Sequence, residues 1–268
     1  MGAIVKFLQS EMEKPGLFSL FHIISLLIII GIAILIAIKY KNCSLKTYKR
    51  IIFIIWLVCI VFEILKQITR SFIYGPPLTF HYDFYHLPFH LCSTMFYVVP
   101  ILLFTSKDKH PLLHEAITGY ICFFVFFAGM VVCVYNQFVM TNIIFINIQT
   151  MIHHGSQVVL GVFMITWNRK NINLKMYFES LIVLGIFIPL AIIINVLIYP
   201  ISDGIDMFYI NPYQMTYLPV FDKIQEKVGY VVYLIIYMIS LSISGLIMYL
   251  LEKECIKLSY KKKSKNAN

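Results

Sequence analysis

The sequence predicts an all-α, polytopic integral membrane protein, and three observations support this. Of the 268 residues, 60% are hydrophobic and only 13% are charged. The mean hydropathy is +0.81. The apolar residues form runs of about 20 residues, which is the length at which a helix spans a bilayer. We therefore expect a single membrane domain over residues 1–268, with no room for a second, soluble domain.

Seven apolar segments are expected to form membrane-spanning helices. Their boundaries are 17–38, 51–73, 87–106, 116–135, 138–166, 180–201 and 228–251. No small-residue cleavage site follows the first segment, so we expect it to be a retained helix. The second segment holds Glu63 and Lys66 on one face, where the two can pair. Only Asn136 and Gln137 separate the fourth and fifth segments, which predicts a tight hairpin.

The distribution of basic residues predicts the orientation. Of 22 Lys and Arg, 16 lie in the first, third and fifth loops and after the last helix, five lie on the other side when Arg70 at the end of the second segment is counted there, and Lys66 lies within that segment. By the positive-inside rule, the N-terminus is outside and residues 252–268 form a basic cytoplasmic tail, with the cluster 261–265 as a topology anchor. We therefore attribute the net charge of +9 to membrane orientation and not to nucleic acid. The richness in Lys, Ile and Asn favours a bacterial cytoplasmic membrane.

The stretch 81–100, HYDFYHLPFHLCSTMFYVVP, is the densest group of reactive side chains. Such groups are costly at the edge of an apolar segment and ask for a functional explanation. Pro88 suits the first turn of a helix, and a helix that begins there puts Cys92 near the positive end of its dipole, which favours a thiolate. The helical period places His90 and Ser93 on one face and Cys92 away from them. A base for Cys92 is therefore expected from another helix.

The fifth segment offers such a base. One arc of this helix holds Asn147, Thr150, His154, Gln157 and Gly161, with His153 beside it. Polar residues in a spanning helix usually face the bundle interior or a water-filled cavity, and a glycine lets a neighbour approach closely. For the Asn, Thr and Gln the alternative is structural hydrogen bonding between helices. The adjacent histidine pair favours a function.

The outer loop 199–227 is a candidate lid or entrance in the head-group layer, because it mixes aromatic and acidic residues. Its polar residues include Asp203, Asp206, Asn211 and Tyr213. The alternative is an interfacial aromatic belt with solvated acids.

A metal centre is a second enzymatic interpretation. His81, Asp83, His86 and His90 have the ligand types of a zinc site. Seven-helix zinc-dependent lipid hydrolases, however, draw histidines from their last helix, and no histidine follows His154. The six cysteines show no CxxC spacing, so neither a zinc ribbon nor a disulfide framework is indicated. We expect no metal and no other cofactor.

Several of these features together resemble the YwaF-like integral membrane family, which is related to animal transmembrane protein 164. They are LPFHLCS at 87–93, the helix-five histidine pair, Glu63, and the Asn195 helix followed by an Asp-rich aromatic loop. The resemblance implies a seven-helix acyltransferase that moves fatty acyl chains between phospholipids, with its catalytic cysteine in the His-Leu-Cys motif. On this sequence that residue is Cys92. Ser93 and the lid segment 204–212, GIDMFYINP, depart from the pattern of the family, which concerns substrate identity more than reaction type.

The expected reaction forms a thioester between Cys92 and a fatty acyl chain. His154 or His153 acts as the base, and membrane phospholipids are the partners. The residues expected to bind or orient the substrate are His90, Ser93, Asn147, Gln157 and Glu63. An alternative from another class is a non-enzymatic transporter or binding component, in which the polar stripe of helix five and the Glu63–Lys66 pair line a path for a small polar solute. The sequence has no internal repeat, which weakens that alternative.

Overall fold

The protein is mostly helical in the computed structural model, which describes residues 1–202 and 204–265, with side chains described as far as residue 259. Within this part of the chain, five helices are long and apolar enough to cross a membrane. They are α2 (Leu20–Tyr40), α3 (Leu45–Ser71), the continuous helix 111–134, α8 (Leu174–Ile198) with its extension to residue 201, and α9 (Phe221–Lys265). The all-α membrane class is thereby confirmed.

Two further predicted segments are helical but differ from these five. The third segment consists of the four residues of η2 (Leu91–Thr94) and the ten of α4 (Met95–Phe104), which cover roughly 23 Å, less than the ~30 Å hydrocarbon core. The fifth corresponds to α7 (Ile144–Asn168), which is long enough but carries the polar stripe. The count of seven spans and the orientation therefore stay predictions.

The remaining elements are short or interrupt longer helices. The helix 111–134 is built from α5 (Pro111–Tyr120), the π-helical turn η3 (Ile121–Val125) and α6 (Phe126–Val134). The short elements are α1 (Gly2–Leu8), the antiparallel strands β1 (Phe72–Ile73) and β2 (Thr79–Phe80), and the turns η1 (Phe84–His86), η4 (Tyr199–Ile201) and η5 (Met207–Tyr209). In α9 the chain bends at Gly229, whose φ is 76°.

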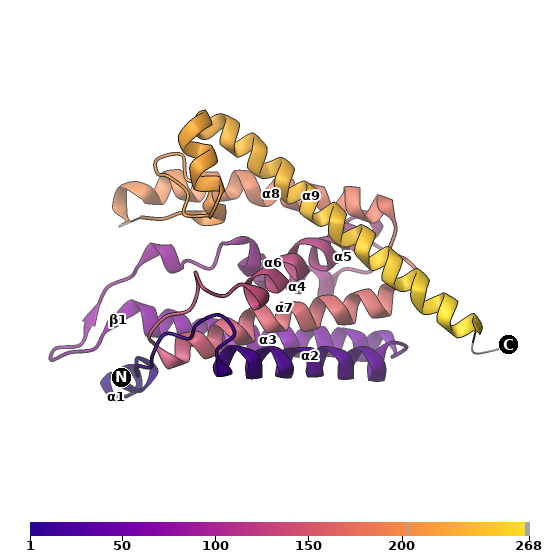
Figure 1. Cartoon of the computed structure of the whole chain (residues 1–268), viewed down its shortest axis with the longest axis horizontal. Coiled ribbons are helices and arrows are strands. Elements are labelled where there is room, and N and C mark those ends of the chain that lie inside the picture. Colours follow the sequence, from indigo (N-terminus) through magenta and orange to yellow (C-terminus); the bar gives the residue numbers. More distant parts are fainter. Residues whose placement is uncertain (203, 266–268) are drawn as a thin grey trace.

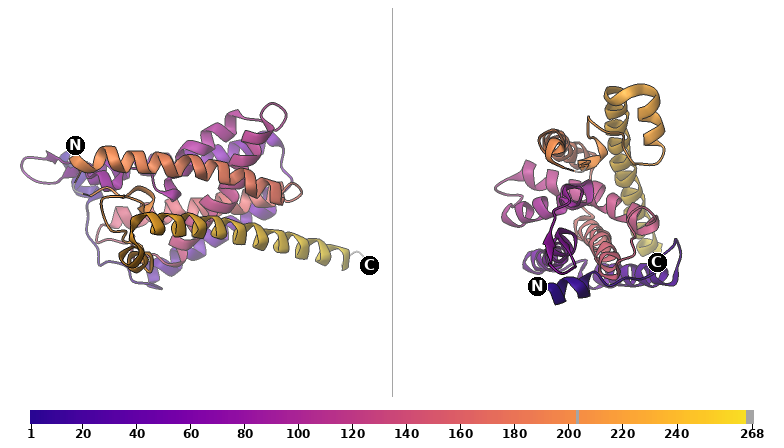
Figure 2. Two further views of the ribbon diagram at one scale, coloured as in Figure 1. Left: turned by 90° about the horizontal axis from the view of Figure 1, so that it is seen from above. Right: turned by 90° about the vertical axis from the view of Figure 1, so that its left-hand side faces the viewer.

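Helix α7 lies at the centre of the bundle. It packs against α2, α3, α6 and η3, and α8 and α9 lie on the far side of α5 and α6 (Figures 1 and 2). All five residues of η3 are fully buried. The polar stripe of α7 is buried as well, as predicted, because this helix is surrounded by others.

The chain ends and loops gather at two ends of the bundle (Figure 1). At one end, Glu11 pairs with Ile143 in a β-bridge and the side-chain amide of Gln9 donates to the carbonyl of Thr69. At the other end, the Lys49 Nζ donates to the carbonyl of Leu103. Successive loops therefore alternate between the ends, and the candidate lid lies at the end that holds the N-terminus.

The predicted tight hairpin between the fourth and fifth segments is wrong. Helix α6 ends at Val134 and α7 begins only at Ile144. The Asn147 side chain binds the intervening chain: it accepts from the Thr141 N–H and donates to the Thr141 carbonyl, both at 2.8 Å. It is also paired with the N-terminal segment. These contacts give a loop over residues 135–143 where apolarity alone predicted helix.

We predict that Gly161→Ala lowers the thermal midpoint in detergent. A Cβ at this position would lie 2.5 Å from the Cγ of Phe126, and overpacking of this kind costs about 1–3 kcal/mol. Gly185→Ala is the matched control, because nothing lies within 4 Å of the Cβ it would add on α8. Equal midpoints for the two variants would contradict the close packing of α6 against α7.

Candidate functional site

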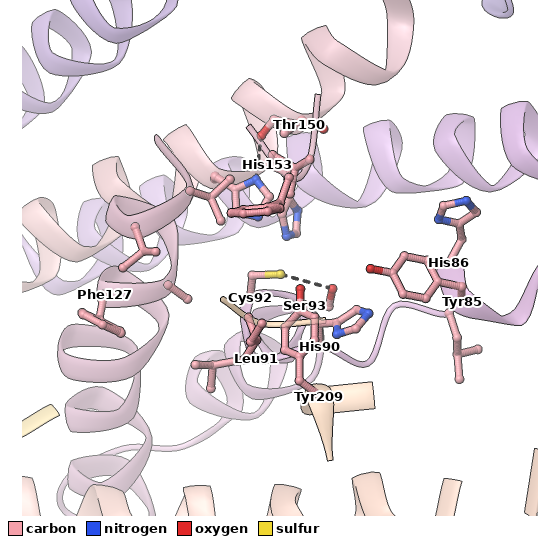
Figure 3. A pocket seen from close by; sticks show the side chains of 18 of the residues that line it. Tyr85, His86, His90, Leu91, Cys92, Ser93, Phe127, Thr150, His153 and Tyr209 are labelled. Carbon is pink, nitrogen blue, oxygen red and sulfur yellow. Dashed lines mark hydrogen bonds between the residues drawn. The ribbon is translucent and has the colours of Figure 1, made fainter. Parts of the chain in front are cut away.

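A cavity of about 590 Å³ lies inside the bundle. Its wall is built from α3, the stretch 85–93, α6, α7, the lid and α9. From the predicted site residues it gathers Glu63, His90, Cys92, Ser93, His153 and His154. Figure 3 shows Cys92 and Ser93 on one side of this cavity and the α7 histidine His153 on the other.

The backbone of the cavity-lining stretch 85–93 is irregular before Leu91. The helix does not begin at Pro88 as predicted: His90 is extended, with φ −83° and ψ 167°, and a 3₁₀ turn starts only at Leu91. Non-helical backbone at membrane depth is tolerated only where protein or water satisfies its polar groups. The stretch therefore needs hydrogen-bond donors from neighbouring helices.

Two glutamines supply such donors from opposite sides. The side-chain amide of Gln67 on α3 donates to the His86 carbonyl, and that of Gln157 on α7 donates to the Cys92 carbonyl, both at 2.8 Å. Helix α6 packs closely against Gln157, since a Cβ on Gly129 would lie only 2.7 Å from the Gln157 Cβ. These bonds fix where the backbone of Cys92 lies along the axis of α7.

Cys92 meets the two histidines of α7, as expected for a partner from another helix. The thiol and one ring nitrogen from each of His153 and His154 all lie within 4.8 Å of one another. The Cys92 Sγ is also 3.9 Å from the Ser93 Oγ, although the helical period had placed these two side chains apart. Both side chains line the same cavity.

The hydrogen-bond network assigns opposite tautomers to the adjacent histidines. The His154 Nδ1 donates to the Thr150 carbonyl at 2.8 Å, which leaves its Nε2 with a free lone pair. The His153 Nε2 accepts from the Gln157 amide at 2.9 Å, so in the neutral ring its proton lies on Nδ1. That Nδ1 is buried and has no hydrogen-bond partner among the described residues. His154 thus offers an acceptor and His153 offers a donor.

His90 does not join this cluster. Its ring lies against Tyr209 and Tyr85, at centroid distances of 5.2 and 5.8 Å. Burial is the largest cause that lowers the pKa of the neighbouring His86 to about 4, so the His86 ring is neutral near pH 7.

Among the described residues, the side chains that could bind a metal ion together are not the predicted zinc ligands. His81, Asp83, His86 and His90 form no group of three ligands in the described part of the chain, whereas Cys92, His153 and His154 do. A thiolate and two imidazoles are ligand types of zinc sites. If this protein holds a metal ion, these three side chains are where it fits.

Glu63 connects α3 to α7 beside the cavity. It is buried and pairs with Lys66 at 2.8 Å, which confirms the predicted pair. Its carboxylate also accepts from Gln67 at 2.6 Å and from Gln149 on α7 at 3.5 Å. Each oxygen of this buried carboxylate therefore already has a protein donor.

Two predicted substrate-binding residues lie outside the cavity lining. Asn147 is bound to the loop at Thr141, as described above, and Gln157 is bound to Cys92 and His153. Both contacts match the structural alternative that the polar stripe left open. The solute path of the transporter alternative therefore lacks Asn147.

The candidate lid folds inward. The Asn195 side chain of α8 holds the Met207 backbone on both sides, at 2.7 and 3.0 Å. Asp206 is only 1% exposed and accepts from the Asn211 N–H at 2.9 Å. It is therefore not a solvated acid. Asp203 lies outside the described residues, and Tyr213 is exposed.

Tyr85 and Tyr209, two of the three tyrosines that line the cavity, were not predicted from the sequence. Phe208 and Tyr209 both have positive φ, and the Tyr209 ring lies in front of His90 (Figure 3). Tyr85 points its hydroxyl into the cavity toward Ser93. The aromatic character of the lid was the only available signal for Tyr209, and nothing distinguished Tyr85 from its aromatic neighbours.

We predict that Gln157→Leu destabilises the protein by about 1–3 kcal/mol, because the Cys92 carbonyl and the His153 Nε2 lose their amide donor in a buried place. Thermal unfolding in detergent measures this. Thr166→Val on the same helix is the control, since its hydroxyl bonds only within α7. Equal losses in both variants would contradict a role for Gln157 beyond its own helix.

We predict that Asp206→Asn becomes progressively more stable than the natural protein between pH 4 and 7. Burial raises the pKa of Asp206 to about 7, so the folded chain holds a proton that the unfolded chain releases near pH 4. The stability gained from this protonation is present below pH 4, is lost as the pH rises through 7, and stays lost above it. Asparagine keeps the acceptor and carries no charge.

Thermal midpoints between pH 5 and 8 test this, with Asp108→Asn as an exposed control. A difference between Asp206→Asn and the natural protein that does not change with pH would show that the carboxyl does not titrate in this range.

Comparison with known proteins identifies one relationship. Residues 17–249 match the model of the TMEM164 family. No curated protein and no solved structure matches the chain.

Proposed function

The chain belongs to the TMEM164 family, and we propose that it is an integral membrane acyltransferase that moves fatty acyl chains between phospholipids and lysophospholipids. The observation that carries this proposal is the cluster of a thiol and two imidazoles of opposite tautomer within 4.8 Å, at the wall of a largely apolar cavity. In this reaction Cys92 is the nucleophile and His154 is the base.

The first half-reaction acylates the thiol. The His154 Nε2 takes the proton from the Cys92 Sγ, and the sulfur attacks the ester carbonyl of a donor phospholipid. Collapse of the tetrahedral intermediate breaks the ester C–O bond, and the leaving alkoxide takes the proton back from His154. The products are a thioester on Cys92 and a lysophospholipid.

Two donors are available for the oxyanion of this intermediate. One is the hydroxyl of Ser93, 3.9 Å from the sulfur. The other is the Nδ1–H of His153, which is buried without a protein partner among the described residues. A donor that is already fixed in place costs no reorganisation when negative charge develops. His153 therefore stabilises the intermediate, whereas His154 moves the proton.

The second half-reaction transfers the acyl chain to an acceptor. His154 takes the proton from the hydroxyl of a second lysophospholipid, and the oxygen attacks the thioester carbonyl. The C–S bond breaks, and the thiolate of Cys92 takes the proton from His154. The lysophospholipid released in the first half-reaction and the one acylated in the second are different molecules, so the net reaction moves the acyl chain from one to the other.

The shape of the cavity supports a lipid substrate. Side chains of α6 and α9 give it an apolar wall, including Ala128, Val132 and Leu241. The lining continues to Val131 and Phe138, which are 47% and 63% exposed on the outside of the bundle. Exposed apolar side chains on a membrane protein face lipid tails, so an acyl chain reaches Cys92 from the bilayer without crossing water.

We predict that Cys92→Ala abolishes acyl exchange in proteoliposomes and that His154→Ala slows it by about 10²- to 10⁴-fold. The assay follows transfer of an isotope-labelled acyl chain from a phospholipid to an unlabelled lysophospholipid by mass spectrometry. Cys133→Ala is the matched control, because this cysteine is buried on α6 and does not line the cavity. Full exchange by folded Cys92→Ala would refute the nucleophile.

The ligand types of the same cluster favour a second candidate, a zinc-dependent lipid hydrolase in which Cys92, His153 and His154 hold the metal. Elemental analysis of purified protein separates the two candidates. Stoichiometric zinc that disappears in Cys92→Ala, together with loss of activity on chelation, supports the hydrolase. Acyl exchange that persists in metal-free protein supports the acyltransferase.

A further inference from the structure

The charged side chains that line the cavity all come from one face of α3. They are Glu63, Lys66 and Arg70. Two cations and one carboxylate give the charged side chains of this lining a net charge of +1. Charged groups within spanning segments are costly and usually compensated. The excess positive charge therefore asks for an anion.

The nearby carboxylates are already occupied. Glu63 is held by Lys66 and by two glutamine amides. Asp83 places one oxygen 3.3 Å from the His86 Nε2 and the other on the Tyr85 N–H. Within the described chain, no carboxylate lies within ion-pair distance of Arg70, and the Arg70 Nε is buried without a hydrogen-bond partner.

The position of Arg70 in the last turn of α3 does not account for this arrangement. A cation at a helix C-terminus gains up to about 1 kcal/mol from the helix dipole at an exposed site, and that gain needs no burial. Arg70 instead lines the cavity with part of its guanidinium shielded from water. The geometry favours a ligand that completes its hydrogen bonds.

We propose that Lys66 and Arg70 form a binding subsite for the phosphate of a glycerophospholipid. This inference rests on the proposed acyltransferase function. A phosphodiester carries one negative charge, which matches the +1 of the lining. The fork of a guanidinium binds two phosphate oxygens at once, and the lysine adds a point charge.

The subsite fixes how the lipid lies in the cavity. The phosphate binds at the end of α3, the ester carbonyl lies at Cys92, and the acyl chain follows the apolar wall of α6 and α9. Lipids of the same acyl composition without a phosphate, such as diacylglycerol, lack the anchor. Arg70 and Lys66 therefore set specificity for phosphate-bearing lipids and take no part in the bond-making steps.

Lipid retention in native mass spectrometry tests the subsite without relying on catalysis. All proteins carry Cys92→Ala, so that bound lipid is not consumed. We expect Arg70→Gln to weaken binding of phosphatidylcholine by about 10- to 100-fold, the effect of losing a charge-assisted hydrogen-bond pair, and to leave diacylglycerol of the same chains unchanged. Arg70→Lys, which keeps the charge but not the fork, is expected to fall between.

Arg50→Gln is the matched control, because Arg50 is exposed near the opposite end of the same helix. Equal weakening of both lipids by Arg70→Gln, or no weakening of either, would overturn the subsite. Displacement of phosphatidylcholine by equimolar inorganic phosphate would also overturn it, since that result describes a general anion site.

The outcome separates this inference from the proposed function. Loss of phosphatidylcholine binding in Arg70→Gln, together with no acyl exchange by the natural protein, keeps the subsite and removes the acyltransferase. Acyl exchange by the natural protein, together with unchanged lipid binding in Arg70→Gln, supports the acyltransferase and rejects the subsite.

Discussion

The site depends on one hydrogen bond, from the side-chain amide of Gln157 to the carbonyl of Cys92, at 2.8 Å. The chain enters the bundle as irregular backbone, and its carbonyls must find donors away from water. Gln157 supplies one of them and, through the same nitrogen, also holds the His153 ring. The Gln157 amide thus fixes both the position of Cys92 along α7 and the tautomer of His153.

The two adjacent histidines gain different chemical roles from this arrangement. Their rings stand at 86° to one another, with centroids 4.9 Å apart. One ring is held by a backbone carbonyl of its own helix and the other by Gln157, so one turn of α7 offers both an acceptor and a donor near the Cys92 thiol. The other cysteines share no such group of ligand atoms in the described chain, which singles out Cys92.

Periodicity was sufficient to predict the features that depend on a regular helix. It predicted the Glu63–Lys66 pair and the burial of the α7 stripe, because both follow from 3.6 residues per turn. It failed where long-range side-chain contacts override local preference. Asn147 captures the loop before α7, and Gln157 together with Gln67 on α3 holds the extended chain before Cys92. The inward fold of Asp206 was likewise invisible, because Asn195 anchors that loop from a distant helix.

A site-resolved search for an acyl adduct on Cys92 tests the proposed thioester directly. The purified protein is supplied with phospholipid alone, quenched in acid, digested and analysed by mass spectrometry with and without hydroxylamine, which cleaves thioesters. We expect a fatty acyl mass on the peptide of Cys92 that hydroxylamine removes and that lysophospholipid discharges. An unmodified Cys92 in folded protein that nevertheless exchanges acyl chains would contradict the thioester.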